Sequence, residues 1–299
     1  MSTSQDPHKS ENPSTYVILD AKSKRELSRL IIQDQMLTNS MGSVLPEQEN
    51  VNAFQRVLDI ACGPGSWVIQ AAQNYPNMSL IGIDINARMI EYARQQADEA
   101  GLTGRVEFHV MDALRPLAFP NDFFDLVNLR AGIGWIRTWE WPHVISEILR
   151  ITRPGGVVRL TDGDALQQTS SPAEKRLLEM GRNALFQSGH LFSQESVGLN
   201  DDLAPLLTRY GCQHVQVKNH ALHYQAGTEA GKAYYEDWKL ALLNGRPFIE
   251  KWSGDSDDYE KLYQQALVEM QQPDFSVTWN FTTAWGYKAS VAQPISGLQ

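Results

Sequence analysis

A glycine loop between an apolar strand pattern and a helical pattern constrains the fold of this chain more than any other feature. Residues 57–60 form a short apolar run, the segment Ala61-Cys62-Gly63-Pro64-Gly65 follows it, and a helical pattern begins near Trp67. Gly63 and Gly65 carry no Cβ, so the loop backbone can approach a ligand closely. This order of strand, loop and helix predicts a βαβ unit whose ligands bind outside the carboxyl ends of the strands.

Strand and helix patterns alternate from this unit up to residue 162. Runs rich in Val, Ile, Leu and Phe predict strands over residues 56–60, 79–84, 106–112, 124–130 and 156–162. Helices are predicted between several of them, over residues 67–74, 86–100 and 141–152. Farther on, the patterns predict helices over 171–188, 229–252 and 257–272, and strands over 214–225 and 276–288. The chain is therefore predicted to be an α/β protein with a mostly parallel sheet.

The predicted organisation has four parts. Residues 1–13 are polar with almost nothing to bury, which predicts a disordered tail. Residues 14–50 are predicted to form an N-terminal helical cap, because four apolar residues recur at roughly helical spacing: Leu27, Leu30, Ile31 and Leu37. Residues 51–165 are predicted to form the ligand-binding core, and residues 166–299 to supply the last two strands with a helical lid.

Charge and cysteine content exclude several classes of protein. The chain has 26 Lys and Arg against 35 Asp and Glu, a net charge of −9, so nucleic acid is not an expected partner. Its only cysteines, Cys62 and Cys212, have no zinc-ligand spacing, so neither a disulfide framework nor a metal is expected. No stretch approaches the roughly 18 apolar residues of a membrane span, and residues 1–30 lack the core of a signal peptide. We therefore expect a cytoplasmic protein.

Carboxylates stand at the ends of the first three predicted strands. Asp84 lies 21 residues beyond Gly63, where a carboxylate can accept both ribose hydroxyls of a nucleoside. Asp112 closes the third strand, and Asp59 lies beside the loop. A dinucleotide site would have glycine where Val68 stands, and Asp59 would repel a pyrophosphate. A nicotinamide oxidoreductase is therefore the less favoured alternative.

Over roughly residues 50–165 the chain resembles the class I S-adenosylmethionine-dependent methyltransferases. Five features match in order: Asp59 with the loop glycines, Asp84, Asp112, the strand 124–128, and the turn 153–156. The resemblance implies a Rossmann-like, seven-stranded, mostly parallel sheet with helices on both faces. It also implies S-adenosylmethionine as cofactor and methyl transfer to a small, apolar or aromatic metabolite on oxygen, nitrogen or carbon. The quinone-biosynthesis-like and natural-product branch is the most similar.

The resemblance and the residue types together predict the cofactor site. The cofactor carries a sulfonium and an ammonium group, which carboxylates attract. For Asp59, orienting the loop by accepting hydrogen bonds from backbone N–H groups is an equal alternative to cofactor contact. For Asp112, the alternative to cofactor contact is a turn role. Trp67 and Met89 are expected mainly to pack at the pocket edge. The predicted contacts are Asp59, Ala61, Gly63, Gly65, Trp67, Asp84, Ile85, Met89, Asp112, Ala113 and Asn128.

Catalytic residues are predicted less directly, because methyl transfer is a direct displacement that needs alignment more than acid or base groups. Arg130, His143 and Tyr16 are the candidates. Arg130 either clamps an anionic group or pairs with a surface carboxylate, and His143 either serves as a base or lies on the surface. The segment Asp162-Gly163-Asp164 is more typical of a turn than of a metal site.

Aromatic residues in the last third of the chain predict an apolar lid. They occur in the predicted helices and on one face of the last strand: Tyr234, Tyr235, Trp238, Phe248, Trp252, Trp279, Phe281, Trp285 and Tyr287. His220 and His223 fall on opposite faces of their strand. Because no base is identifiable, a cofactor-binding or regulatory protein without turnover remains the alternative function. The N-terminal helix is also compatible with packing in a homo-oligomer.

Overall fold

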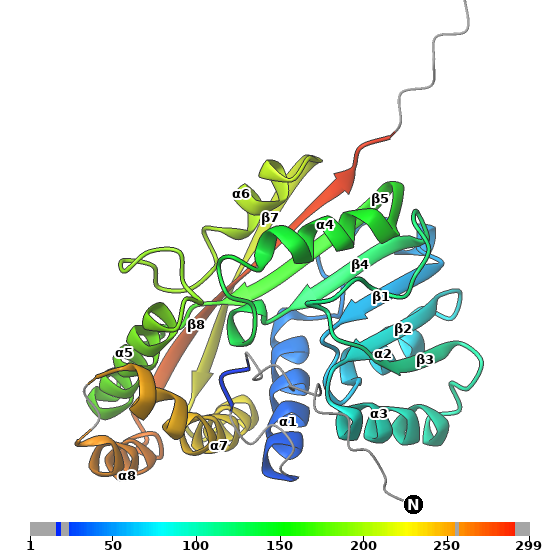
Figure 1. Cartoon of the computed structure of the whole chain (residues 1–299). Coiled ribbons are helices and arrows are strands. Elements are labelled where there is room, and N and C mark those ends of the chain that lie inside the picture. Colours follow the sequence, from blue (N-terminus) through cyan, green and yellow to red (C-terminus); the bar gives the residue numbers. More distant parts are fainter. Residues whose placement is uncertain (1–15, 19–23, 255–256, 291–299) are drawn as a thin grey trace, which may run out of the picture.

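The computed structural model describes residues 16–18, 24–254 and 257–290, and their strands form a sheet of eight (Figure 1). Its order is β3-β2-β1-β4-β5-β8-β6, and β7 pairs with β8 beside this path. Strands β1 to β5 pair in parallel, whereas β6, β7 and β8 join by antiparallel pairing. The strands are β1 (Arg56–Ile60), β2 (Ser79–Asp84), β3 (Val106–Val110), β4 (Phe124–Arg130), β5 (Thr152–Gly163), β6 (Gln168–Thr169), β7 (Cys212–Gln225) and β8 (Ser276–Lys288).

The predicted Rossmann-like α/β fold is confirmed, with eight strands where seven were expected. The additional strand is β6, whose two residues are too few to give a period-2 pattern. The helices are α1 (Lys24–Met41), α2 (Ser66–Asn74), α3 (Ala87–Glu99), α4 (Trp141–Ile151), α5 (Pro172–Gln187), α6 (Leu203–Arg209), α7 (Glu229–Trp252) and α8 (Tyr259–Glu269). Helix α6 was not predicted, and the tail 1–13 lies outside the described residues.

Two hydrophobic clusters cover the two faces of the sheet, because successive residues of a strand point to opposite sides. Val57 and Leu126 pack with residues of α2 and α3. Leu58 and Val127 pack with residues of α4 and α6 on the other face. The parallel strands are thus buried on both sides, which explains their nearly continuous apolar runs.

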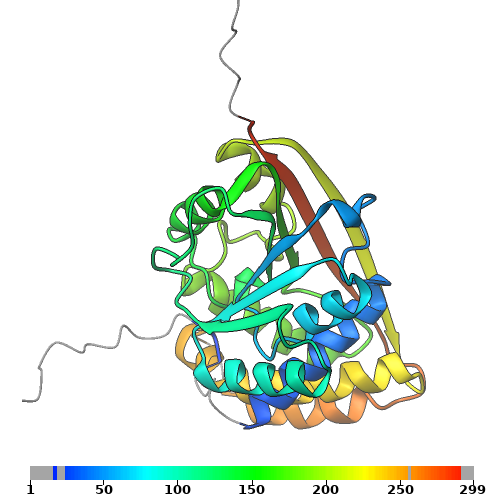
Figure 2. The ribbon, with the colours of Figure 1, turned by 90° about the vertical axis from the view of Figure 1, so that its right-hand side faces the viewer.

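A cap built from α1, α5, α7 and α8 forms a third layer at one end of the sheet (Figures 1 and 2). β5 ends at Gly163, which pairs with Phe281, while β7 and β8 stay paired beyond that point to the Gln225–Ser276 pair. The paired strands β7 and β8 thus extend the sheet into the cap. A separate hydrophobic cluster fills the cap, and Tyr234, Phe248 and Trp279 belong to it.

Two local predictions need correction. The segment 153–156 was expected to be a turn before the fifth strand, but β5 already begins at Thr152. The register shifts after the Phe124–Thr152 pair, and Gly155 has φ 70°, so the segment interrupts pairing inside the strand. In α1 the side expected to be buried is only half-buried at Leu27, Leu30 and Ile31. The fully buried positions include the charged residues Glu26 and Arg29.

Candidate cofactor site and active site

Glycine is required at positions 63 and 65 of the loop for different structural reasons. Both have positive φ, 52° at Gly63 and 79° at Gly65, a region that side chains disfavour. A Cβ on Gly65 would lie 2.6 Å from the Phe108 ring and 2.8 Å from Ala93, so packing within the protein requires that glycine. A Cβ on Gly63 would meet nothing nearer than Leu30 Cδ1 at 3.9 Å. Of the two loop glycines, only Gly63 therefore faces open space that a ligand can occupy, whereas Gly65 is required by packing, and its contact with a cofactor stays a prediction.

Asp84 holds the loop through the backbone. One carboxylate oxygen accepts a hydrogen bond from Gly63 N at 2.9 Å and the other accepts from Asn86 N at 2.8 Å. Burial raises the pKa of Asp84, and these two N–H donors oppose the rise. The loop-orienting role considered for Asp59 therefore belongs to Asp84. Each oxygen keeps a lone pair, so the fixed carboxylate still suits ribose hydroxyls.

Asp59 belongs to a buried polar row across three strands. Asp59, Asn128 and Arg159 are register neighbours on β1, β4 and β5. Asn128 donates to Asp59 Oδ1 at 2.7 Å and accepts from Arg159 at 2.7 Å. Arg159 in turn donates to Glu47 Oε1 at 2.7 Å. Sequence reasoning missed Glu47 and Arg159, although an arginine inside the apolar run 157–160 was a signal that it needed a buried partner.

The row sets the charge state of Asp59. Burial raises the pKa of Asp59 to about 7, against the attraction of Arg130 and the hydrogen bond from Asn128. The negative charge of Asp34 on α1 adds to the rise. Asp59 is thus a carboxyl group whose ionisation a nearby cation would favour.

The remaining predicted cofactor contacts divide between surface and core. Asp112 is half-buried and accepts from Leu114 N at 2.9 Å, which is the turn role given as its alternative. Ile85 is 63% exposed after β2, and Ala113 is half-buried after β3. Trp67 and Met89 are 1% and 3% exposed, so both act mainly in packing.

The predicted catalytic residues do not form one group. Arg130, at the end of β4, pairs with Asp34 of α1, a carboxylate that is 11% exposed and not the surface carboxylate given as its alternative. Tyr16 donates to Glu26 Oε1 at 2.7 Å, and burial raises the pKa of its phenol. His143 is exposed at the start of α4, separate from both. Cys62 is buried, which raises its thiol pKa and makes it a poor nucleophile.

The carboxylates of the 162–164 segment are engaged by protein donors. Asp162 accepts from Ile133 N and Gly163 N, both at 2.9 Å, and burial raises its pKa to about 7. Asp164 accepts from Asn200 at 2.6 Å and from Asn280 at 3.3 Å. Across residues 16–18, 24–254 and 257–290, no three His, Cys, Asp or Glu side chains converge as metal ligands. Within the same ranges, no helix has the length and apolarity to cross a membrane.

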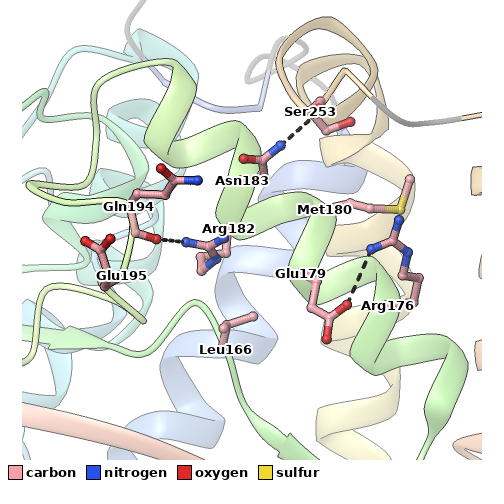
Figure 3. A pocket seen from close by; sticks show the side chains of 9 residues that line it. All are labelled: Leu166, Arg176, Glu179, Met180, Arg182, Asn183, Gln194, Glu195 and Ser253. Carbon is pink, nitrogen blue, oxygen red and sulfur yellow. Dashed lines mark hydrogen bonds and ion pairs between the residues drawn. The ribbon is translucent and has the colours of Figure 1, made fainter.

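A hollow of about 490 Å³ lies in the cap between α5 and the turn around Gln194 (Figure 3). Its walls carry two arginines and two glutamates, and Arg182 donates to the backbone carbonyl of Gln194. In Figure 1, helix α1 stands between α5 on one side and α2 and α3 on the other. The hollow beside α5 is therefore separate from the glycine loop, which precedes α2. The lining residues are Leu166, Arg176, Glu179, Met180, Arg182, Asn183, Gln194, Glu195 and Ser253.

Comparison with known proteins gives a match centred on the loop and the parallel strands. A family model described as a methyltransferase domain matches residues 57–156. The 27-O-demethylrifamycin SV methyltransferase of Amycolatopsis mediterranei is 33% identical over 154 residues, covering 50% of this chain and 53% of that protein. The demethylmenaquinone methyltransferase of Geobacillus kaustophilus is 32% identical over 109 residues, covering 36% and 45%. The chain thus spans about half the length of these two relatives.

A solved structure extends the likeness of fold to the cap. The phosphoethanolamine N-methyltransferase 2 of Haemonchus contortus, in complex with S-adenosyl-L-methionine, superposes with a TM-score of 0.56 at 19% identity. The superposition covers 94% of this chain and 61% of that one. The loop geometry, the sheet order and the domain match agree with the resemblance drawn from the sequence. Residues 57–156 thus match a methyltransferase domain, and the fold around them is the one that this solved methyltransferase has.

Proposed function

We propose that this chain transfers the methyl group of S-adenosylmethionine to a small aromatic or largely apolar metabolite, on oxygen, nitrogen or carbon. One observation carries the acceptor class. Two buried N–H donors in the aromatic cap, Trp238 Nε1 and Gln167 Nε2, find no hydrogen-bond partner among the described residues. A buried donor without a partner is costly, so a ligand that supplies an acceptor atom there gains binding energy.

The surroundings of these donors are aromatic. Trp238 lies 5.6 Å from Trp279 and 6.0 Å from Tyr234, measured between ring centroids. Phe281 lies 4.7 Å from Trp279, and the Tyr234 hydroxyl donates to Gln167 Oε1 at 2.5 Å. Flat rings around two N–H donors favour an aromatic acceptor that carries oxygen atoms, such as a phenol or a quinol.

The order of the strands in the sheet supports the same order for the parts of the cofactor, from adenine through ribose to sulfonium. Asp112, Asp84 and Asp59 stand at β3, β2 and β1, with Arg130 next on β4. We assign the adenine to the β3 end, the ribose to Asp84 and the sulfonium to the space beside Asp59 and Gly63. The methyl group then lies at the β4 and β5 ends, on the side of the cap. S-adenosylmethionine, when bound, supplies an electrophilic methyl group and a neutral thioether leaving group.

The protein's part in this chemistry is alignment and exclusion of water. Helix α1 lies between the glycine loop and α7, and ion pairs fix it on both sides, through Arg130 with Asp34 and Arg29 with Asp237. Tyr16 acts on this arrangement through Glu26. We keep Arg130 and Tyr16 as residues of the site on these contacts, whereas the proposal does not use the exposed His143.

The test is a methylation assay with purified full-length chain, methyl-labelled S-adenosylmethionine and a panel of simple acceptors. A phenol, an aromatic amine and a hydroquinone offer oxygen, nitrogen and ring carbon atoms, and the fragmentation mass spectrum of the product shows which atom carries the methyl group. We expect label in an organic extract with one of them. Trp238→Phe removes the orphan N–H but keeps an aromatic ring, so it should raise KM for the acceptor and leave S-adenosylhomocysteine affinity unchanged. Tyr235→Phe, on the same helix, is the matched control.

Two outcomes oppose the proposal. Tight binding of S-adenosylhomocysteine without a labelled product from any acceptor class would favour a cofactor-binding or regulatory protein. Label that reaches only polar acceptors would contradict the assignment of the aromatic cap. The domain boundaries at residues 13, 50 and 165 and the cytoplasmic location stay predictions.

A further inference from the structure

We propose that Asp34 of α1 and Arg130 of β4 together bind the amino-acid end of the cofactor, Asp34 its ammonium group and Arg130 its carboxylate. The inference rests on the cofactor order proposed above and adds a residue, Asp34, that lies outside the matched domain segment. It also gives the N-terminal helix a role in ligand recognition as well as in covering the site.

The position of the pair fits the length of the cofactor. Neighbouring strands lie about 4.8 Å apart, so β2 and β4, which flank β1, lie about 10 Å apart. A ribose held at Asp84 on β2 therefore leaves the amino-acid end near the end of β4, where Arg130 stands. Asp34 is close to the loop as well, since its charge acts on both Asp59 and Cys62.

The pair also has the charges that a zwitterion requires. The Arg130 and Asp34 side chains are 20% and 11% exposed and form an ion pair with each other. The second carboxylate oxygen, Asp34 Oδ2, is buried and finds no hydrogen-bond partner in the described part of the chain. A bound ammonium group would satisfy it, and the adjacent carboxylate would lie beside the Arg130 guanidinium.

Helix α1 is placed to present Asp34 to such a ligand. Leu30, one turn before Asp34, is the nearest side chain to the open side of Gly63. The Arg130 guanidinium lies 5.9 Å from the centre of the Trp67 ring, and the Trp67 indole donates to Val44 O at 3.0 Å, just beyond α1. The pair thus lies between the glycine loop and its covering helix, and not on the outer surface.

The test is calorimetry on the full chain with two ligands that share the nucleoside. S-adenosylhomocysteine carries the amino-acid end, and 5′-methylthioadenosine lacks it. Asp34→Asn should weaken S-adenosylhomocysteine by about 10- to 100-fold, the loss typical of a charge-assisted hydrogen bond, and leave methylthioadenosine within about twofold. Gln35→Ala, an exposed neighbour on α1, should change neither affinity.

A second arm needs no variant, so it holds even if Asp34→Asn fails to fold. The unsubstituted protein should bind S-adenosylhomocysteine about 10- to 100-fold more tightly than a third ligand, its deaminated analogue, which keeps the carboxylate and lacks only the amino group. In Asp34→Asn that preference should disappear. Equal losses for both nucleosides in Asp34→Asn, or no preference in the unsubstituted protein, would overturn the inference. Failure of the unsubstituted protein to bind any of these ligands would instead overturn the proposed function.

Discussion

The glycine loop and the contact between α1 and α7 both contain buried carboxylates, but the donors that these carboxylates accept from differ. At the loop, Asp84 accepts from backbone N–H groups and Asp59 accepts from the neutral amide of Asn128. In the cap, Glu26 and Asp237 share the guanidinium of Arg29, at 2.7 and 3.2 Å. Neutral donors leave the loop carboxylates free to attract a cationic ligand. The ion pairs of the cap instead dock α1 onto α7.

The difference teaches where each region is vulnerable. Arg29 pairs with two buried carboxylates at once, so its loss would remove one guanidinium from both Glu26 and Asp237. The loop depends on shape as well as charge, since its backbone is held by a glycine that packs against Phe108. Removal of a charged residue should therefore destabilise the cap, because it leaves buried charges unbalanced. Addition of a side chain should destabilise the loop, because it overlaps neighbouring atoms.

The largest expected effect is on the cap. Arg29→Ala should lower the free energy of unfolding by about 3–5 kcal/mol, because it breaks a buried ion pair by removing one partner. Arg246→Ala is the matched control: Arg246 also pairs with two carboxylates, Glu250 and Glu260, but on the surface, so about 0–1 kcal/mol is expected. Urea unfolding followed by tryptophan fluorescence measures both. Similar losses for the two variants would break the comparison.

The next effect separates the two loop glycines. Gly65→Ala should lower the free energy of unfolding by roughly 2–4 kcal/mol, since the new Cβ overlaps Phe108 and the alanine has to adopt a positive φ. Gly63→Ala has only the backbone strain of about 1–2 kcal/mol, because its Cβ points to open space. Thermal unfolding ranks the two, and calorimetry should find that Gly63→Ala nevertheless weakens S-adenosylhomocysteine. A more stable Gly65→Ala than Gly63→Ala would contradict the packing argument.

Ligand affinity should distinguish the loop carboxylates. Asp84→Ala should weaken S-adenosylhomocysteine by about 1.5–3 kcal/mol, through lost ribose hydrogen bonds and a released Gly63 N–H. Asp112→Ala should cost about 1 kcal/mol or less, because Asp112 is half-buried and pairs with the exposed Arg115 at 3.7 Å. Titration calorimetry compares them, with circular dichroism to check the fold. An unchanged affinity in Asp84→Ala would refute its assignment.

The smallest effect is a pH dependence. Asp59 has a pKa raised to about 7 by burial, so it is mostly neutral below pH 7 and ionised above it. Cationic S-adenosylmethionine gains attraction from the ionised form, whereas neutral-sulfur S-adenosylhomocysteine gains less. Relative affinity for S-adenosylmethionine should thus rise between pH 6 and 8, by about threefold over the whole range, because a partly solvated charge pair contributes less than about 1 kcal/mol. Asp59→Asn should abolish the trend, and a trend that persists would place the titrating group elsewhere.

Local patterns determined the part of the molecule to which we assign the cofactor. The bounds of β1, β2, β4, α7 and β8 agree with the sequence-based expectations, because each has a clear period or a capping residue of its own. The glycine loop and Asp84 were predicted for the same reason, since their roles depend on residues close by in the chain. The two-residue β6 and the seven-residue α6 were missed, because so few residues show no period.

Only the tertiary structure decided which charges are buried together. Arg159 and Glu47 are separated by 112 positions, Arg29 and Asp237 by 208, and Arg130 and Asp34 by 96. A charged residue in a helix looks solvent-exposed in a sequence, as Glu26 and Arg29 do, until a distant segment supplies its partner. Burial of a charge depends on that partner and not on the neighbouring residues. The sequence predicted an N-terminal helical cap, but the ion pair that brings Asp34 of α1 to Arg130 of β4 followed from packing alone.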